Sequence, residues 1–292
     1  MKKILITGAN GFLGSHLLER FILNKEDIVI LTRSKSDLSR IMHLTDRVRS
    51  YNIDKDSIES IFMEEKPDII IHTACSYGRN NEGLFDIIEA NLIYGLSLLE
   101  QAFKHNVQTF INTDSLLPKN VSNYSLSKSH FSDWLRKYSN RIQVVNLKIE
   151  HMYGPNDDKK KFVPWLISQM IDGTGEIRLT SGVQKRDFVY IDDIVDAFDL
   201  ILKKRENLST WNQFDVGTYF FMEVKEFVLK IADEIETKYG TKIAHRLNFG
   251  ALPYRKGDIM VPKVDNKSLL DLGWKPKWSI EEGIREILLK HT

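Results

Sequence analysis

A tyrosine stands four residues before a lysine at two places in this chain: Tyr124 with Lys128, and Tyr51 with Lys55. Residues at this spacing share one face of a helix, so the lysine ammonium can act on the tyrosine hydroxyl. A tyrosine ordinarily titrates at about pH 10, and a nearby positive charge helps it to exchange a proton at neutral pH. Tyr124 opens a predicted helix, whereas Tyr51 ends a predicted strand and enters a turn. We therefore predict proton transfer by Tyr124 and Lys128, and regard the other pair as coincidental.

Three glycines near the N-terminus have the spacing of a phosphate-binding loop. They follow an apolar run over residues 4–6 and precede a stretch whose apolar residues recur at helical spacing. Small residues let the backbone turn tightly and approach a pyrophosphate, and the helix N-terminus adds free N–H groups and partial positive charge. Since the strand and the helix that this motif requires are both present, we predict a dinucleotide site. Its contacting residues are Gly8, Asn10, Gly11, Phe12, Leu13 and Gly14.

The elements that must position these residues alternate regularly through the first half of the chain. Short apolar runs, interpreted as strands, lie at residues 4–6, 28–31, 68–72, 109–112 and 144–147. Helical patterns fall between them, notably over residues 84–104 and 126–138. Strands that are apolar on both faces and alternate with helices indicate a Rossmann-like, doubly wound parallel sheet of the α/β class.

This rhythm breaks at Gly154-Pro155, where a charged loop follows. The remainder mixes short strands with helical patterns at residues 163–171, 191–203, 224–239 and 280–290. We therefore predict a dinucleotide-binding Rossmann domain over residues 1–154 and a smaller, mixed α/β substrate domain over residues 155–292. Within the second stretch, we expect that segments near residues 186–216 can pack back onto the first domain.

Composition excludes several classes of function. The 41 lysines and arginines balance 40 aspartates and glutamates, so the net charge of +1 offers no field for nucleic acid or an anionic membrane. Cys75 is the only cysteine, which excludes an internal disulfide and a thiolate zinc site, and the histidine spacings suggest no metal. No run reaches the ~20 apolar residues of a membrane span, and the N-terminal run is too short for a signal peptide. We expect a cytoplasmic protein without bound metal.

The glycine spacing and the order Ser115, Tyr124, Lys128 resemble the extended short-chain dehydrogenases/reductases, the NAD-dependent epimerase/dehydratase family, which act on nucleotide sugars. The resemblance runs from residue 4 to about residue 285. It implies that Ser115 hydrogen-bonds the substrate oxygen, that Tyr124 exchanges the proton and that Lys128 also holds the nicotinamide ribose. Thr113 is the alternative hydroxyl, because only nine residues separate Ser115 from Tyr124, fewer than is usual in the family. In that case Ser115 occupies the place of the glutamate base of the family's 4,6-dehydratases, so dehydration is not expected.

The second strand ends at Thr32-Arg33-Ser34, without the acid that bonds the ribose 2′-hydroxyl in NAD-binding members of the family. A guanidinium and a hydroxyl would instead hold a 2′-phosphate, so NADP(H) is favoured and NAD(H) is the alternative. The other interpretation is that Arg33 only lies on a solvated rim. The resemblance implies further cofactor-site residues, which are Asn52, Ile53, Thr73, Ala74, Cys75 and Asn91.

Four residues of the second half match substrate positions of the family. His151 stands where relatives usually carry an asparagine near the nicotinamide and the sugar. Arg186, in an Arg-Asp-aromatic motif, would grip the substrate diphosphate, a bidentate task suited to guanidinium. Arg255 and Asp258 match a second arginine and an acid at the nucleotide.

Within the family, the segment over residues 150–155 and the short loop between Ser115 and Tyr124 are most similar to the CDP-abequose/CDP-paratose synthase group. This resemblance implies NADPH-dependent reduction of a 4-keto nucleoside-diphosphate sugar, with a CDP-sugar favoured, in the synthesis of surface-polysaccharide (lipopolysaccharide O-antigen) sugars. The first alternative is a nucleotide-sugar 4-epimerase with tightly bound NAD, and the second is a non-catalytic NADP(H)-binding sensor. The family also implies a homodimer.

Overall fold

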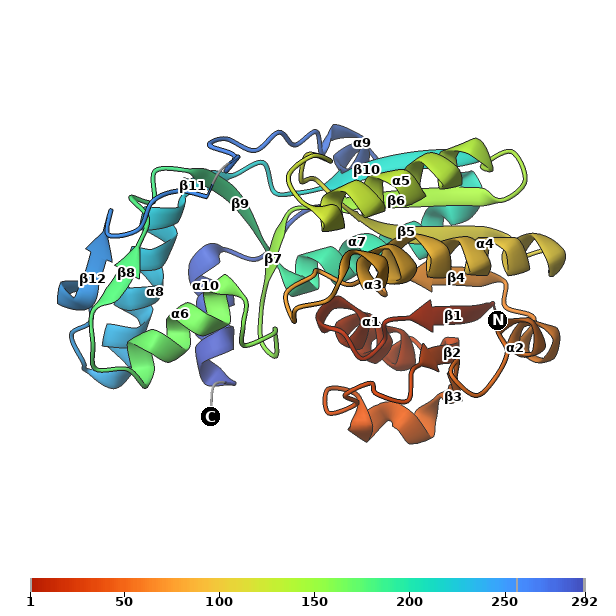
Figure 1. Cartoon of the computed structure of the whole chain (residues 1–292), viewed down its shortest axis with the longest axis horizontal. Coiled ribbons are helices and arrows are strands. Elements are labelled where there is room, and N and C mark those ends of the chain that lie inside the picture. The colour runs from red at the N-terminus through yellow and green to blue at the C-terminus, as the bar shows by residue number, and fades with distance from the viewer. Residues whose placement is uncertain (1, 256, 291–292) are drawn as a thin grey trace.

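A seven-stranded parallel sheet forms the centre of the larger part of the molecule (Figure 1). The computed structural model describes residues 2–255 and 257–290. The strand order is β10-β6-β5-β4-β1-β2-β3, and every neighbouring pair is parallel. The strands are β1 (Lys3–Thr7), β2 (Asp27–Thr32), β3 (Arg49–Asn52), β4 (Ile69–His72), β5 (Thr109–Ser115), β6 (Gln143–Ile149) and β10 (Trp211–Val216).

Helices cover both faces of this sheet because its strands are apolar on both sides. Leu5 and Ile6 are neighbours in β1 and point to opposite faces, yet both are fully buried. Ile6 packs in a core with α1 (Phe12–Leu23) and α7 (Ile191–Lys204), and Leu5 in a core with α2 (Ile58–Glu65), α4 (Tyr94–Lys104) and α5 (Asn123–Lys137). The doubly wound α/β fold predicted from the sequence is confirmed. No helix of the described residues is long and apolar enough to cross a membrane.

The smaller part of the molecule holds two short sheets and the helices that pack on them (Figure 1). A three-stranded sheet has the order β11-β9-β7, and a two-stranded sheet pairs β12 with β8. The strands are β7 (His151–Tyr153), β8 (Ile177–Leu179), β9 (Lys185–Tyr190), β11 (Phe221–Glu223) and β12 (Leu247–Phe249). The helices are α6 (Phe162–Ile171), α8 (Val224–Tyr239) and α10 (Ile280–Leu289), while α9 (Lys267–Asp271) lies against β10.

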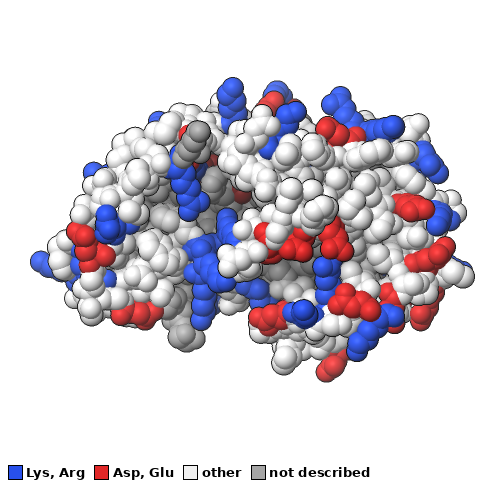
Figure 2. All heavy atoms as spheres, in the orientation of Figure 1, with Lys and Arg blue, Asp and Glu red and all other residues white. Residues whose placement is uncertain are grey.

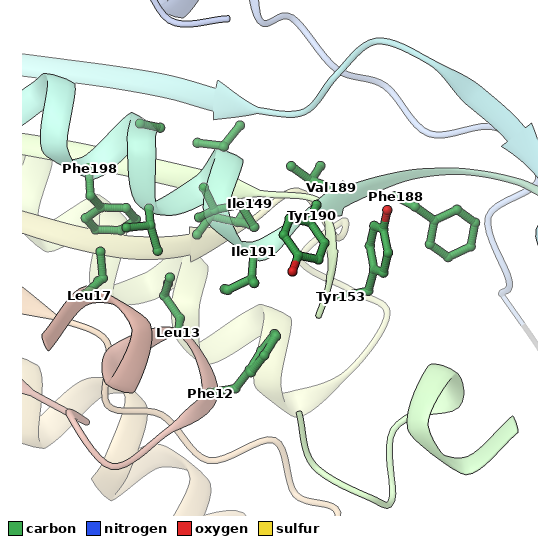
Figure 3. Close-up of a cluster of buried hydrophobic side chains, with 14 of the residues drawn as sticks. Phe12, Leu13, Leu17, Ile149, Tyr153, Phe188, Val189, Tyr190, Ile191 and Phe198 are labelled. Carbon is green, nitrogen blue, oxygen red and sulfur yellow. The ribbon is translucent and has the colours of Figure 1, made fainter. Parts of the chain in front are cut away.

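A buried cluster of aromatic and aliphatic side chains joins the two parts (Figure 3). Phe12 and Leu13, at the start of α1, belong to the same cluster as Tyr153 and Phe188 of the smaller part. Phe188 in turn stacks on Phe227 of α8, with ring centroids 3.7 Å apart. This continuous core holds the larger and the smaller part of the molecule together.

The chain passes between the two parts more than once. From β9 it runs directly into α7, which packs on α1, and β10 then pairs with β6 in the large sheet. After β10 it returns to the smaller part with β11 and α8. Residues of the segment 186–216 therefore contribute to both parts, and the domain boundary at residues 154 and 155 stays a prediction.

The strand order reverses between β1 and β4, which are neighbours in the sheet. In doubly wound folds, ligands bind at such a point, outside the carboxyl ends of the strands. The loops that follow β1 and β4 touch here, since a Cβ added to Gly8 would stand 2.6 Å from the backbone nitrogen of Ala74. The topology thus predicts a ligand site at these two loops.

Candidate active site

A cleft of about 2060 Å³ runs along the carboxyl ends of the strands and between the two parts. Figure 2 shows it as a hollow with lysine and arginine side chains gathered at its edge. Every predicted catalytic, cofactor-binding and substrate-binding residue lines this cleft except Asn52 and Asn91. Within residues 2–255 and 257–290, no group of three or more His, Cys, Asp or Glu side chains could hold a metal ion. The cleft therefore brings most of the predicted site into one space.

The glycine loop, residues 8–14, lines the cleft and has no room for a larger side chain at Gly8 or Gly14. Gly8 has a φ of +70°, in the left-handed region, and a Cβ there would also strike the backbone of Ala74. A Cβ on Gly14 would lie 2.0 Å from the Gly8 carbonyl oxygen, because α1 packs directly on the loop. The Gly11 N–H closes the turn by donating to the Gly8 oxygen at 2.9 Å. The loop therefore offers bare backbone and a helix N-terminus, as a pyrophosphate requires.

Two arginines line the cleft beyond the end of β2. Arg33 was singled out from the sequence, whereas Arg40 was not. Arg40 donates to the carbonyl oxygens of Asn10 and Asn156, and so links the glycine loop to the segment after β7. Asp37 places one carboxylate on the same rim. Local pattern gave no sign of Arg40 because it reaches the cleft from an irregular segment through contacts distant in sequence.

Asn52 and Asn91 do not line the cleft. Asn52 donates its side-chain N–H to the Ser34 hydroxyl at 3.0 Å, just after β2. Asn91 is fully buried; its side chain accepts the Ser76 N–H at 2.7 Å and donates to the Ser127 hydroxyl of α5 at 3.0 Å. The structure thus gives both residues a supporting position, one beside β2 and one between α5 and the segment after β4.

Tyr124 and Lys128 reach the cleft from one face of α5. The helix begins here because Ser122 caps it: the Ser122 hydroxyl accepts the Ser125 N–H, and the Ser125 hydroxyl accepts the Ser122 N–H, both at 3.1 Å. Lys128, one turn after Tyr124, is 1% exposed, and its ammonium has no hydrogen-bond partner among the described residues. Ser115, the last residue of β5, lines the same cleft. All three members of the predicted triad therefore share this space.

Burial governs the pKa values of Tyr124 and Lys128. The expectation that Lys128 lowers the Tyr124 pKa is wrong. Burial raises the pKa of Tyr124 well above its ordinary value, and Cys75 and Asp114 act in the same direction. The cation that lowers the Tyr124 pKa most is Arg79, and not Lys128 as expected. Burial also lowers the pKa of Lys128. Tyr124 therefore retains its proton at neutral pH, because removing it would place a charge in a poorly solvated site.

Tyr77 and Arg79 come from the segment after β4, and sequence reasoning did not single them out. Both line the cleft, and the Tyr77 ring lies 4.8 Å from the Tyr124 ring, centroid to centroid. No motif marks these residues. Their position after a strand whose carboxyl end meets the glycine loop is the signal that could have found them.

The substrate residues predicted from the sequence line the wall formed by the smaller part. The Arg186 guanidinium pairs with the Asp258 carboxylate, with 2.5 Å between Nη2 and Oδ1, so Asp258 orients Arg186. His151 Nδ1 lies 2.8 Å from Glu150 Oε2, which orients the imidazole in the same way. Arg255 lines the same wall.

Tyr51 and Lys55, the pair regarded as coincidental, do not line the cleft. The Tyr51 hydroxyl instead donates to Glu65 Oε1 at 2.7 Å. The Lys55 N–H closes a turn by donating to the Asn52 carbonyl oxygen. Tyr51 thus belongs to β3, and Lys55 to the turn between β3 and α2.

Residues 4–217 match the model of the NAD dependent epimerase/dehydratase family. This chain belongs to that family. The resemblance seen in the glycine spacing and the Ser-Tyr-Lys order is thereby confirmed, and the protein is an enzyme of the short-chain dehydrogenase/reductase type. A non-catalytic sensor is no longer an alternative.

Three curated relatives represent different activities within the family. The chain is 32% identical to the CDP-abequose synthase of Salmonella typhimurium (strain LT2), over 98% of this chain and 97% of the relative. It is 27% identical to the dTDP-D-glucose 4,6-dehydratase of Mus musculus, over 98% and 87%. It is 25% identical to a putative UDP-glucose 4-epimerase of Methanocaldococcus jannaschii, over 98% and 97%.

Solved structures share the fold of the whole chain. The UDP-glucose 4-epimerase of Thermotoga maritima with UDP-glucose has a TM-score of 0.84 at 24% identity, covering 99% of this chain and 98% of its own. The UDP-glucose 4-epimerase of Thermus thermophilus with NAD has a TM-score of 0.82 at 23% identity, with the same coverage. At these identities the likeness establishes the architecture alone.

Proposed function

We propose that this enzyme is an NADPH-dependent 4-ketoreductase of a CDP-linked sugar, and that it works in the cytoplasm in the synthesis of a surface-polysaccharide sugar. Its full-length similarity to CDP-abequose synthase supports the nucleotide and the pathway. The observation that carries the reaction is that Ser115, Tyr124 and Lys128 line one cleft together with the glycine loop. A ketoreductase needs a proton donor at the carbonyl oxygen, and the Tyr124 hydroxyl can supply that proton.

The cofactor side of the cleft fits a dinucleotide phosphate. The glycine loop is a cradle that a Cβ on Gly8 or Gly14 would fill, and its backbone would hold the pyrophosphate. Arg33 and Arg40 would hold the ribose 2′-phosphate, since both guanidinium side chains line that rim of the cleft. When bound there, the dinucleotide would supply the hydride for the carbonyl carbon.

The residues of α5 and β5 handle the carbonyl oxygen. Tyr124 delivers its proton to this oxygen, and the Ser115 hydroxyl donates a hydrogen bond to it. Lys128 would hold the nicotinamide ribose, a task that suits a buried ammonium with no hydrogen-bond partner among the described residues. Thr113 is the alternative to Ser115, because its hydroxyl is also buried without a hydrogen-bond partner among the described residues.

The substrate side fits a nucleoside diphosphate. Arg186 would bind the diphosphate as a fork whose direction Asp258 fixes, and Arg255 would add a second positive charge. His151 would contact the sugar beside the nicotinamide, in the orientation that Glu150 gives it.

The second candidate function is a 4-epimerase with tightly bound NAD, which the similarity to the Methanocaldococcus jannaschii relative favours. Such an enzyme keeps its cofactor through each cycle, whereas a ketoreductase must exchange it at every turnover. Cofactor that stays with the protein through gel filtration would favour the epimerase.

We also infer a homodimer. Apolar side chains of the α3–α5 region are unusually exposed, with Phe85 of α3 (Leu84–Ile88) 85% exposed and Ile93, just before α4, 53% exposed. Trp134 of α5 is 39% exposed and borders a hollow lined by Leu96 of α4. An exposed apolar face of this kind marks a protein contact, and its burial against a second copy would give twice the monomer mass in solution.

The decisive assay is NADPH oxidation with a CDP-linked 4-keto-dideoxyhexose, with UDP- and dTDP-linked 4-keto sugars as comparisons. Tyr124→Phe keeps the ring and removes only the proton donor, so kcat should fall by ~10²–10⁴-fold while NADPH affinity is unchanged. Tyr51→Phe is the matched control, because its hydroxyl lies outside the cleft, and it should keep wild-type kcat. Wild-type turnover by Tyr124→Phe would refute the mechanism, and loss of turnover in Tyr51→Phe would mean that the wrong pair was chosen.

A further inference from the structure

Asp114 is a buried carboxylate beside the hydroxyls that are proposed to bind the carbonyl oxygen. It lies near the end of β5, between Thr113 and Ser115, lines the cleft and is 6% exposed. Its Oδ1 accepts the N–H of the following Ser115 at 2.8 Å, and its Oδ2 accepts the side-chain N–H of Asn146 at 3.0 Å. Burying a carboxylate is costly unless it is hydrogen-bonded, and here each oxygen has a partner.

Asn146 connects this carboxylate to the helix that carries Tyr124. It lies on β6 and is fully buried. Its side-chain nitrogen donates to Asp114 and to the Ser132 hydroxyl of α5, at 3.0 Å in both cases. Its side-chain oxygen accepts the side-chain N–H of Asn112, its register partner on β5, at 2.7 Å. These four side chains therefore form one hydrogen-bonded group that joins β5, β6 and α5.

Ser132 lies on the face of α5 that carries Tyr124 and Lys128, which we call the catalytic face. The three residues are spaced four apart, so they follow one another along that face at successive turns. The hydrogen-bonded group therefore fixes the catalytic face against β5, one turn beyond Lys128. A slide or rotation of α5 would displace the Tyr124 hydroxyl, and a misplacement of about 1 Å can cost on the order of 10²-fold in rate.

We propose that Asp114 is a positioning residue, which acts through Asn146 and Ser132 to hold Tyr124 at the carbonyl oxygen. Its hydrogen bonds fix the catalytic face of α5 against the end of β5. Its negative charge favours delivery of the Tyr124 proton to the substrate over removal of a proton from it. The inference rests on the proposed ketoreductase function, in which Tyr124 is the proton donor.

The charge of Asp114 acts on both groups of the catalytic face. Burial raises the pKa of Tyr124 most, and Cys75 and Asp114 raise it further. Burial lowers the pKa of Lys128, whereas Cys75 and Asp114 oppose this change. Asp114 thus favours a protonated tyrosine and a charged lysine, which are the forms that reduction needs. The side chains that act on the Tyr124 pKa come from the segment after β4 and from β5, and they are Cys75, Tyr77, Arg79 and Asp114.

Two variants separate the hydrogen bonds of this group from its charge. Ser132→Ala breaks the bond to α5 and keeps the carboxylate, so kcat for reduction should fall about fivefold, with KM and the pH dependence unchanged. Asp114→Asn also removes the charge, so kcat should fall about tenfold or more. It should shift the pH dependence of the reverse reaction, oxidation of the reduced sugar with NADP⁺, to lower pH by about one unit, because Tyr124 then loses its proton more easily.

Matched controls lie on the same helix. Ser129→Ala and Asp133→Asn make the same two chemical changes at residues outside the hydrogen-bonded group, one half-buried and one exposed, and should keep the wild-type kcat and pH dependence. Ser132→Thr retains the hydroxyl and should recover most of the kcat that Ser132→Ala loses. Steady-state kinetics in both directions between about pH 6 and pH 10 measure these values, and circular dichroism checks the fold of each variant.

Three results would overturn the positioning role while the proposed function stands. They are a wild-type kcat in Ser132→Ala, a raised KM with unchanged kcat in either variant, and a slow Asp114→Asn enzyme whose pH dependence is that of wild type. Should Asp114→Asn fail to fold, the kcat of Ser132→Ala decides the proposal. An inactive wild-type enzyme with every 4-keto nucleotide sugar would instead refute the proposed function, and this inference with it.

Discussion

The two walls of the cleft are built in different ways. The cofactor wall comes from the carboxyl ends of parallel strands, with the glycine loop after β1, Arg33 after β2 and Cys75 after β4. The substrate wall comes from short strands and an irregular segment, where Arg186 of β9 depends on Asp258, 72 residues further along the chain. Regular strands fix most of the first wall, with Arg40 and its distant partner Asn156 as an exception, whereas partners distant in sequence fix the second wall. Changes in one wall should therefore leave the ligand of the other wall almost unaffected.

The largest expected difference between the effects on nucleotide-sugar binding and on NADPH binding follows from replacing Arg186 of the substrate wall. Arg186→Ala should weaken nucleotide-sugar binding by about 2–5 kcal/mol, because it also leaves the Asp258 carboxylate without its partner. NADPH affinity should stay the same. Isothermal titration with CDP and with NADPH measures both values on one preparation.

Two further variants sharpen this result. Arg186→Lys keeps the charge but loses the planar fork, so it should recover only part of the affinity for CDP. Asp258→Asn keeps the guanidinium and loosens its direction, and should have a smaller effect than Arg186→Ala. If NADPH and CDP affinities fell together in Arg186→Ala, the two walls would not be independent.

Local pattern was enough to predict the cofactor half of the fold. The five apolar runs interpreted as strands correspond to β1, β2, β4, β5 and β6, because buried parallel strands are apolar on both faces and stand out in the sequence. The predicted strand near Tyr51 corresponds to β3. The predicted helix over residues 84–104 is continuous, although residues 89–93 form a π-helical turn between α3 and α4. The pairing of β10 with β6, of β9 with β7 and of β12 with β8 was not predicted, since such long-range contacts leave no periodic signal.

The candidate site shows the same division. The positions of Tyr124 and Lys128 on one helix face followed from their spacing, and both line the cleft. Tyr77 and Arg40 escaped prediction because they come from irregular segments, where spacing carries no geometric information. The direction of the Tyr124 pKa was wrong for a related reason: it depends on burial by residues from several elements, and the sequence shows only the nearest lysine.

A smaller effect is expected for Asp193, which lies where the two parts of the molecule are joined. Asp193, in the first turn of α7, is fully buried and accepts the N–H groups of Lys277 and Trp278, while its carbonyl oxygen accepts the Trp274 indole N–H. Burial raises the pKa of Asp193 from 3.8 to about 6. Its folded pKa therefore exceeds its unfolded value, so its contribution to stability is complete below about pH 4 and is lost as the pH rises through 6.

Asp193→Asn removes this titration. Relative to the variant, the wild-type enzyme should lose up to about 3 kcal/mol of unfolding free energy between pH 4 and pH 7. Urea denaturation of both proteins at several pH values measures the difference. Parallel stability curves for the two proteins over this range would show that Asp193 does not titrate as its burial suggests. NADPH and CDP affinities at pH 7 serve as the control. Because Asp193 belongs to neither wall, Asp193→Asn should change both affinities to the same extent.

The smallest expected effect concerns the rim of the cofactor wall. Arg33 is exposed, so solvent weakens its attraction for a 2′-phosphate, and Arg33→Ala should lower NADPH affinity only about tenfold. NADH lacks this phosphate, and its affinity should not change, so the preference for NADPH narrows without disappearing. Arg40→Ala should narrow it further, because Arg40 also holds the Asn10 and Asn156 carbonyl oxygens and its loss loosens the rim. Fluorescence titration with both cofactors distinguishes the two variants. Equal NADPH and NADH affinities in the wild-type enzyme would refute the NADPH preference, and would mean that Arg33 only lies on a solvated rim.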